Sequence, residues 1–197
     1  MKSKSLEGDE PDGKVFLDIS MSLDGFIAGK ADDVERLHEW ILDFKTGIFK
    51  KSEILNELFE RTGAIVAGRR VYDITSGWGG NHPIRGVPVY VLSHDIPENV
   101  PQGGTVFSFV SEGIEVAIRE AKESAGDKDV YVLGGAAVAQ QCLEASLLDE
   151  IQVHIAPVLL TEGIRLFDHF GSECIQLEPI RALESHGTTH LRYRIIK

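Results

Sequence analysis

The strongest constraint on the fold is the segment Asp129–Ala139, where a short apolar run meets two glycines and then a helix-forming stretch. Val130 to Leu133 combines β-branched, aromatic and aliphatic residues, which suits a buried strand. Gly134 and Gly135 end that strand and leave the backbone open to close approach, because they carry no Cβ. The following helix begins with unpaired N–H groups and a positive dipole end. The segment is therefore either a cradle for a phosphate or an ordinary tight turn between a strand and a helix.

Strands and helices alternate along most of the chain. The patterns predict strands over residues 14–22, 64–67, 87–92, 105–109 and 129–133, and helices over residues 32–44, 52–61, 111–126 and 136–146. Gly63 is expected to stop the second of these helices. Strands over residues 148–160, 177–183 and 189–196 close the chain, the last two as an antiparallel pair. This order predicts an α/β fold, a three-layer sandwich with a central mixed, mainly parallel sheet and an antiparallel C-terminal edge.

Length and charge narrow the class of protein. The 197 residues suit one domain, which we expect over residues 14–197 after a disordered tail over residues 1–13. A formal net charge of −11 argues against nucleic acid as the main partner. The chain has no apolar run that could cross a bilayer and no signal-peptide pattern. Its two cysteines are expected to be free buried thiols in a reducing compartment, so we expect a cytoplasmic protein without a membrane partner.

The first strand predicts a polar face at one end of the sheet. Asp18, Ser20 and Ser22 alternate along it and therefore share one side. They either line a cleft or form the solvent-facing stripe of an edge strand. The turn that follows carries Asp24 and then a small apolar loop with Ile27 and Ala28, and loops at strand ends often hold ligands. We therefore expect a binding site near this turn.

Two further segments carry candidate site residues. Arg69 and Arg70 follow Gly68 at the start of a predicted helix, where cations oppose the dipole unless an anion neutralises them. Alternatively they are solvated surface arginines. Trp78 lies in a glycine-rich loop, where it forms a lid, a pocket wall or a plug over the core. His186 and His190 are four residues apart, but they lie in a predicted turn, so we expect no metal site.

Three of the parallel strands end in features that suit a nucleotide. These features are Gly68–Arg70, Leu92–Ser93 and Gly134–Gly135. In open α/β sheets, ligands bind beyond the carboxyl ends of the strands. The coincidence predicts a nucleotide site at that edge.

These motifs, in this order, resemble the dihydrofolate reductase fold. The closer resemblance is to its riboflavin-biosynthesis branch, the reductase domain of the bacterial bifunctional deaminase-reductase and the small stand-alone proteins related to it. The residues that carry the resemblance are Ser22-Leu-Asp-Gly25, Ile65-Val-Ala-Gly-Arg69, Val89-Tyr-Val-Leu-Ser93 and Val130-Tyr-Val-Leu-Gly-Gly-Ala136. The chain departs from true dihydrofolate reductases, because no proline precedes Trp40 and no acid follows it at a matching position.

The resemblance implies NADPH as cofactor. It implies a pyrophosphate site at Gly134, Gly135, Ala136 and Ala137, phosphate contacts at Gly68, Arg69 and Arg70, and adenosine contacts at Leu92 and Ser93. Ser20, Ile27 and Ala28 match positions that border the nicotinamide, and Asp18, Ser22, Asp24 and Trp78 are expected on the substrate side. Members of this branch often dimerise, and long C-terminal strands with edges to cover would suit a homodimer.

The implied chemistry is hydride transfer to a C=N or C=O carbon of a pyrimidine- or pterin-like heterocycle, as in 5-amino-6-(5-phosphoribosylamino)uracil reductase. A carboxylate in a partly dry cleft can deliver the matching proton. Asp24 is the first candidate and Asp18 the second, although Asp24 can equally hold the turn before Gly25. A phosphate on the substrate would need a cation, for which Arg85 and Arg165 are candidates. The alternatives are a dihydrofolate reductase-type activity and a module that binds NADPH without catalysis.

Overall fold

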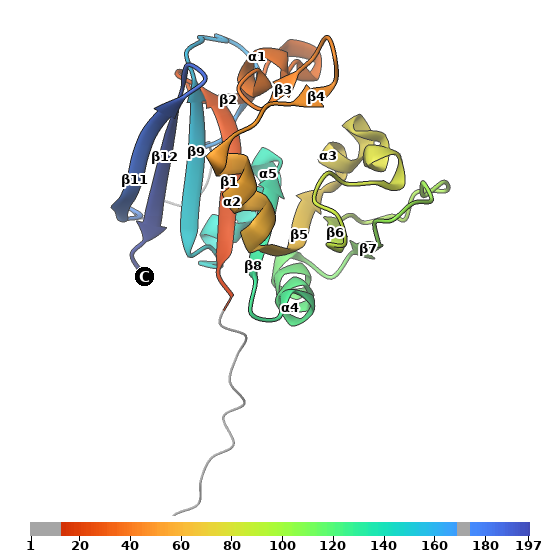
Figure 1. The fold of residues 1–197 in the computed structure, drawn as a ribbon. Helices are drawn as coiled ribbons and strands as arrows, with labels where there is room; N and C mark the ends of the chain where they lie inside the picture. The colour runs from red at the N-terminus through yellow and green to blue at the C-terminus, as the bar shows by residue number, and fades with distance from the viewer. Residues whose placement is uncertain (1–12, 169–173) are drawn as a thin grey trace, which may run out of the picture.

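Eight strands form one sheet through the middle of the molecule, in the order β11-β12-β9-β1-β8-β5-β6-β7 (Figure 1). The computed structural model describes residues 13–168 and 174–197, so the predicted tail lies outside the described residues except for Gly13. The strands of this sheet are β1 (Val15–Ser22), β5 (Thr62–Gly68), β6 (Val89–Leu92), β7 (Phe107–Val110), β8 (Asp129–Gly134), β9 (Glu150–Ala156), β11 (Leu177–Ser185) and β12 (Thr188–Ile195).

The pairing of the strands is parallel over most of the sheet. β9, β1, β8, β5, β6 and β7 pair in parallel, whereas β12 pairs antiparallel with β9 and β11 pairs antiparallel with β12. The predicted fold class, with its antiparallel C-terminal edge, is confirmed. β9 ends at Ala156, directly before Pro157, where the sequence predicted an interruption.

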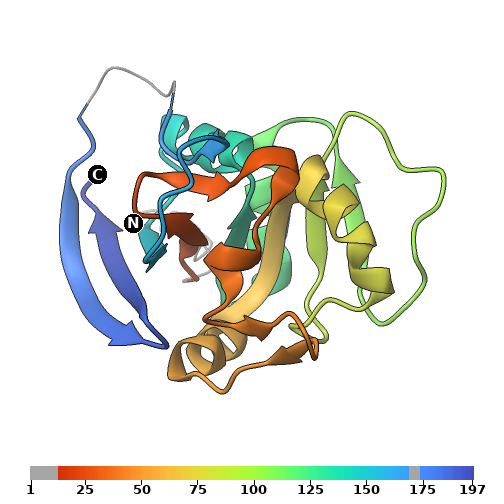
Figure 2. The ribbon, with the colours of Figure 1, turned by 90° about the horizontal axis from the view of Figure 1, so that it is seen from above.

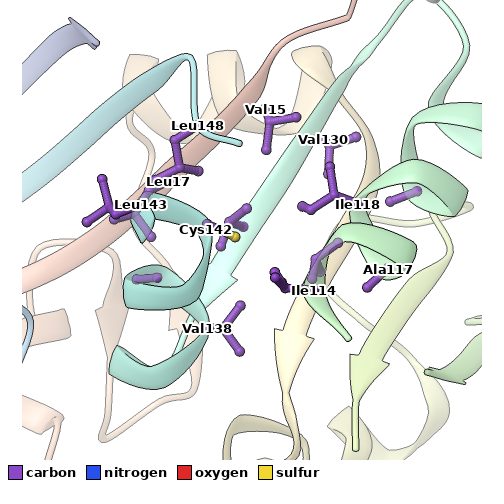
Figure 3. Close-up of a cluster of buried hydrophobic side chains, with 14 of the residues drawn as sticks. Val15, Leu17, Ile114, Ala117, Ile118, Val130, Val138, Cys142, Leu143 and Leu148 are labelled. Atoms are coloured by element: carbon purple, nitrogen blue, oxygen red, sulfur yellow. The ribbon is translucent and has the colours of Figure 1, made fainter. Parts of the chain in front are cut away.

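Alternation along the central strands produces two apolar layers. In β5, Ala64 and Val66 belong to one buried cluster, and Ile65 and Ala67 to the other. The first cluster lies under α4 (Ile114–Ala125) and α5 (Ala136–Glu144), and Figure 3 shows its side chains between these helices and the sheet. The second lies under α2 (Glu53–Arg61) and α3 (Arg69–Ile74). Seen from above, α2 and α5 lie on opposite sides of the sheet (Figure 2). A parallel sheet covered on both faces explains the nearly continuous apolar strands.

Residues 32–44 do not form the predicted helix. One helical turn, α1 (Glu35–His38), is followed by a hairpin of β3 (Leu42–Asp43) and β4 (Ile48–Phe49). The apolar residues that gave helical spacing serve different surfaces: Trp40 is 3% exposed in the core, whereas Phe44 is 41% exposed. Burial of Trp40 by the tertiary fold outweighs the weak local preference for a longer helix.

Two smaller expectations also differ from the structure. The helix over 52–61 is present as α2, but Gly63 lies inside β5 rather than at the helix stop. A Cβ on Gly63 would lie 2.8 Å from the carbonyl oxygen of Ala125, so glycine is required by the close approach of the turn before β8. Cys142 is buried as expected, whereas Cys174 is exposed.

The last short strands are β2 (Phe26–Ala28) and β10 (Ile164–Arg165), which pair antiparallel beside the end of β1. Within residues 13–168 and 174–197, no helix combines the length and the apolar character that crossing a membrane requires.

Candidate active site

A cleft of about 1100 Å³ opens at the carboxyl ends of the central parallel strands. Its walls include Ser20 near the end of β1, Gly68 at the end of β5, Leu92 at the end of β6 and Gly135 just after β8. The three strand ends that suited a nucleotide in the sequence therefore meet at one edge of the sheet. This is the position where open α/β sheets bind ligands.

The glycine pair at this edge adopts a backbone that other residues rarely adopt. Gly134 has φ 103° and Gly135 has φ 82°, in the region that favours glycine. A Cβ on Gly134 would lie 3.0 Å from Cδ1 of Ile19, and one on Gly135 would lie 3.6 Å from Cγ2 of Val71. α5 starts at Ala136, so the first N–H groups of a nine-residue helix lie at the cleft wall. The turn has the open backbone and the dipole that an anionic group requires.

Arg69 and Arg70 line the cleft, but both guanidinium groups already have protein partners. Arg69 donates from Nε to Asp73 at 2.8 Å, and from Nη1 to Ser93 Oγ at 3.3 Å and to the Asp95 carbonyl at 3.1 Å. Arg70 donates from Nε to Asp32 at 3.0 Å. The anions that neutralise the two arginines in this structure are thus carboxylates of the protein itself, Asp73 and Asp32. Arg69 also fixes Ser93 beside the end of β5.

Most of the predicted cofactor residues line the same cleft. They are Ser20, Ile27, Ala28, Gly68, Arg69, Arg70, Leu92, Ser93, Gly135, Ala136 and Ala137, together with Trp78 from the predicted substrate side. Gly134, Asp18, Ser22 and Asp24 are not among the described residues of the cleft wall. Trp78 is half-buried and forms a wall, with its ring edge-on to His82 at a centroid distance of 4.6 Å.

Asp24 and Ser22 are engaged in holding the turn between β1 and β2. Ser22 Oγ donates to Asp24 Oδ1 at 2.6 Å and accepts from the Phe26 N–H at 2.9 Å. Asp24 also accepts from the N–H groups of Leu160 and Thr161, at 3.1 and 2.8 Å. The hydrogen bond from Ser22 is the main cause that lowers the pKa of Asp24, and these backbone bonds add to it. A carboxylate held in its ionised form favours the structural alternative for Asp24 over proton delivery.

Asp18 lies deeper, at one end of a chain of buried side chains. Asp18 Oδ1 is 2.9 Å from His154 Nε2, His154 Nδ1 is 2.7 Å from His190 Nδ1, and His190 Nε2 is 2.9 Å from Ser185 Oγ. Burial, and next the neighbouring His154, lower the pKa of His190 to about 4, so this ring is neutral at pH 7. One set of tautomers then satisfies the chain: Ser185 donates to His190, His190 to His154, and His154 to Asp18.

One oxygen of Asp18 remains without a partner. Asp18 is 5% exposed, and its Oδ2 makes no hydrogen bond to any described residue. Its charge acts on two side chains of the cleft wall. It adds to burial in raising the pKa of Tyr131 well above the usual value, and it opposes the burial that lowers the pKa of His38. Asp18 is therefore a buried acceptor behind the cleft, close enough to influence groups that face it.

The cleft wall beside α2 is apolar with few polar groups. Its residues come from α1, the β3–β4 hairpin, α2, the segment 74–84 and the end of β8, and they include Leu42, Phe49, Leu55, Phe59, Trp78 and Leu133. We call this part the acceptor section. The polar side chains that line it include His38, His82 and Tyr131. Apolar walls with a few placed polar groups are typical of small-molecule sites.

Taken together, the cleft joins a glycine turn suited to an anionic group and an apolar chamber in one continuous cavity. A long ligand with a phosphate part and a planar part can lie along it, with a second molecule against the α2 side. A group of three or more side chains able to hold a metal ion is absent from residues 13–168 and 174–197.

Comparison with known proteins fits this geometry. Residues 13–191 match the family model described as the RibD C-terminal domain. The chain belongs to the RibD C-terminal domain family. YyaP of Bacillus subtilis (strain 168), an uncharacterized protein, is 28% identical, with 78% of this chain and 80% of YyaP covered.

Solved structures share the fold of this chain. A protein of Shewanella sp. PV-4, provisionally assigned to riboflavin biosynthesis, is 25% identical with a TM-score of 0.73, and the match covers 93% of this chain and 99% of that one. Dihydrofolate reductase from Enterococcus faecalis, solved as a complex with NADP(H), is 13% identical with a TM-score of 0.58, covering 94% of this chain and 98% of that one. At that identity the second likeness shows the fold alone. This RibD C-terminal domain therefore has a dihydrofolate reductase-like fold.

Sequence reasoning passed over several polar residues of this RibD C-terminal domain. Tyr131 stood inside a strand assigned to the core, and His154 stood on the strand face opposite Ile151 and Val153. Both faces of the sheet are covered, so that opposite face is buried as well, and His154 is 1% exposed. A histidine at a buried strand position requires a hydrogen-bond partner, which is the signal that could have directed attention to it.

Proposed function

We propose that this protein is an NADPH-dependent reductase that acts on a C=N or C=O bond of a heterocyclic acceptor. One observation carries the proposal: the left-handed glycine turn at Gly134–Gly135 and the apolar acceptor section are walls of one cleft at the carboxyl ends of the parallel strands. Membership of the RibD C-terminal domain family supports it, because the motifs of this chain resemble the reductase domain of the riboflavin-biosynthesis deaminase-reductase. The solved dihydrofolate reductase complex with NADP(H) supports the choice of cofactor.

Each group of cleft residues has a separate task in this proposal. Gly135, Ala136 and Ala137 bind the pyrophosphate through backbone N–H groups, and the open backbone at Gly134 lets it approach. Ser93, Leu92 and the Arg69 side chain border the adenosine end, while Ser20, Ile27 and Ala28 border the nicotinamide. When bound, NADPH supplies a hydride to the acceptor carbon and becomes NADP⁺, while the acceptor nitrogen or oxygen takes a proton from water.

We assign Asp18 a positioning role in this reaction rather than direct contact. Its carboxylate lies behind Tyr131 and His38, and it has an oxygen with no partner among the described residues. A negative charge at this depth stabilises an acceptor that becomes positive as it takes up its proton. The chain through His154 and His190 holds the carboxylate in place. Asp24, which was the first candidate from the sequence, holds the turn.

The first experiment is a calorimetric titration of the purified protein with NADPH and with NADH. We expect NADPH to bind, and Gly135→Asp to abolish binding, because the new side chain places bulk and negative charge in the turn. The matched control is Gly187→Asp, at a glycine with φ 73° and no atom within 4 Å of an added Cβ, in the β11–β12 turn. Wild-type affinity in Gly135→Asp would refute the pyrophosphate site. Binding without any NADPH oxidation across a panel of heterocycles would instead favour the non-catalytic module.

We also propose a homodimer. β11 pairs only with β12 among the described strands, so one side of this nine-residue strand has no strand partner there. Leu177 and Ile180 on it are 43% and 42% exposed. A second copy would cover such an edge. Sedimentation equilibrium tests this proposal, and a monomer at micromolar concentration contradicts it.

A further inference from the structure

The two parts of the cleft differ in charge. The charged side chains among its described walls are Asp32, Arg69, Arg70, Asp95, Arg165 and Asp168, and they all lie outside the acceptor section. Among the described residues, the wall of the acceptor section contains no lysine, arginine, aspartate or glutamate. The difference bears on the second ligand, because a charged molecule in an apolar chamber needs a partner of opposite charge.

The arginines in or near the cleft lie outside the acceptor section. Arg165 donates from Nη1 to the Asp24 carbonyl at 3.1 Å, and its guanidinium lies 4.3 Å from the centroid of the Phe26 ring. Arg70 is paired with Asp32. Arg85 is exposed and lies outside the described cleft wall. Of the two arginines that the sequence offered for a substrate phosphate, Arg85 therefore lies outside the described cleft wall, and Arg165 lines the cleft over the Phe26 ring rather than in the acceptor section.

The histidines of the acceptor section do not supply a cation either. Burial lowers the pKa of His82 to about 4, and burial is also the main cause that lowers the pKa of His38. Both rings are neutral at pH 7. His38 Nδ1 is 3.0 Å from the Val34 carbonyl and must donate to it, which leaves Nε2 as an acceptor. His82 Nδ1 accepts from the Ile84 N–H at 3.1 Å, which leaves Nε2–H as a donor.

The rim of the acceptor section is apolar and partly open. Phe44 and Phe49, on either side of the β3–β4 turn, line the cleft but remain 41% and 43% exposed. Phe59, Trp78 and Tyr131 add aromatic surface further in. An occupant with an apolar substituent would bury the two rim rings and remove their apolar surface from water, which favours binding. Aromatic walls of this kind favour a planar ring system.

We propose that the acceptor is an uncharged, planar heterocycle with an apolar substituent and without a phosphate. This proposal rests on the reductase function proposed above and defines its substrate class. Neutral donor and acceptor nitrogens at His82 and His38, with the Tyr131 hydroxyl, suit a ring that carries an amide-like N–H and C=O edge. The chain would then differ from 5-amino-6-(5-phosphoribosylamino)uracil reductase in the part of the substrate that it recognises.

The test compares binding of a matched pair of compounds to the protein, with and without saturating NADP⁺. The pair is 5-amino-6-(5-phosphoribosylamino)uracil and its dephosphorylated form, which differ only in the phosphate. The third probe, 6,7-dimethylpterin, is an uncharged planar ring whose substituents are apolar. We expect calorimetry to show that the dephosphorylated form binds at least about 100-fold more tightly than the phosphorylated form, because a phosphate in this chamber has no partner. Equal or tighter binding of the phosphorylated form overturns the proposal, and so does a failure of both uncharged compounds to bind.

A designed cation sharpens the same test. Phe59→Lys places an ammonium group in the acceptor section. It should reduce the preference for the dephosphorylated over the phosphorylated compound by about tenfold or more. Asn56→Lys, one turn earlier on the exposed side of α2, changes the net charge equally and should leave the preference unchanged. The same narrowing in both variants would show that the selectivity comes from net charge alone. NADP⁺ binding is measured separately, so a failed cofactor site is distinguished from a wrong substrate class.

Discussion

The two ends of β9 carry buried polar clusters of opposite design. At the amino end, the carboxylate of Glu150 is 2% exposed and meets three cations: Lys14 at 2.6 Å, Arg192 at 2.6 Å and Arg61 at 3.1 Å. Near the carboxyl end, His154 on the same strand face belongs to a chain of buried side chains that ends at Asp18, one oxygen of which has no described partner.

The difference follows the position of the cleft. The saturated cluster lies at the end of the sheet away from the cleft, where complete pairing of charge favours one rigid packing. The Asp18 cluster, in which one carboxylate oxygen has no described partner, lies behind Tyr131 and His38. This is the carboxyl end of the strands, where parallel sheets bind ligands. An acceptor left without a protein partner beside a cleft is suited to act on a ligand. We therefore propose that the first cluster supports stability and the second supports function.

The largest expected effect comes from breaking the saturated cluster. Glu150→Gln removes the carboxylate charge that meets Lys14, Arg61 and Arg192 together. It should lower the free energy of unfolding by about 3 kcal/mol. The matched control is Glu178→Gln, whose exposed ion pair with Arg194 should contribute less than about 1 kcal/mol. Urea denaturation measures both. Similar losses of unfolding free energy in the two variants would show that the buried Glu150 cluster stabilises the fold no more than an exposed ion pair does.

The opposite pattern is expected at the other end of the strand. Asp18→Asn keeps the size of the side chain and an oxygen for His154, so the free energy of unfolding should change by less than about 1 kcal/mol. Loss of the negative charge should lower kcat about 10²-fold, with little change in KM or in NADPH affinity. Steady-state kinetics over a range of pH check this prediction. A stability loss with unchanged kcat would make Asp18 a structural residue like Glu150.

Acid should weaken the two clusters in different pH windows. The folded pKa values of His190 and His82, both about 4, lie below the ordinary 6.5. The unfolded chain then binds more protons, so stability is complete above about pH 6.5 and is lost toward pH 4, by roughly 1–2 kcal/mol for each histidine. Burial alone would raise the pKa of Glu150, but hydrogen bonds from Lys14 and Arg192 and the charge of Arg61 outweigh it and lower the pKa to about 2. Its contribution is therefore lost only between about pH 4.5 and pH 2.

Urea denaturation at a series of pH values separates the two windows. His190→Asn should remove only part of the stability loss between pH 6.5 and 4, because His82 titrates in the same window. Glu150→Gln should flatten the loss below pH 4.5. A wild-type curve that is flat from pH 6.5 to 4 would contradict the lowered pKa values of His190 and His82 in the folded protein.

The fold was predictable because its signals are local. The apolar runs and glycine stops at 64–68 and 129–135 specify buried strands that end in turns, and both appear where expected. The sequence also brought most of the cofactor residues to one edge, since parallel strands share their carboxyl ends. The helix predicted over 32–44, which does not form, shows the limit of this reasoning. Apolar residues at helical spacing can lie on one buried face of a helix, or they can belong to an irregular segment in which one residue packs in the core and another lines the cleft. The spacing alone does not distinguish these two cases.

The site was harder to predict because its decisive contacts are long-range. Asp24 and Asp18 look alike in the sequence, and the N–H groups and the histidine that distinguish them lie more than 130 residues away along the chain. Neither spacing nor residue type can give the tautomers of His38 and His82, which depend on the partners of each ring.

A smaller effect on stability is expected at Trp40, which contacts both Ser20 in the cleft wall and the two histidines of the Asp18 chain. Trp40 donates from Nε1 to Ser20 Oγ at 2.9 Å, and its ring lies 4.3 and 4.7 Å from the rings of His154 and His190. Trp40→Phe keeps most of the packing and removes this hydrogen bond, so stability should fall by about 1 kcal/mol. Thermal unfolding checks the value. A loss as large as that of Glu150→Gln would mean that the cleft end is as rigidly built as the other.

The smallest effect on the reaction is expected at Asp24, the acid that the sequence favoured most. Its oxygens accept hydrogen bonds from Ser22, Leu160 and Thr161, and it lies outside the described cleft wall. Asp24→Asn keeps the shape and one accepting oxygen, so kcat should stay within about threefold of wild type, against the loss of about 10²-fold expected for Asp18→Asn. The two variants remove the same charge from residues six positions apart, so the ratio of their kcat values isolates depth and hydrogen bonding as the cause. A larger loss of kcat in Asp24→Asn than in Asp18→Asn would indicate that Asp24 delivers the proton. The Asp18 chain would then be a second structural cluster.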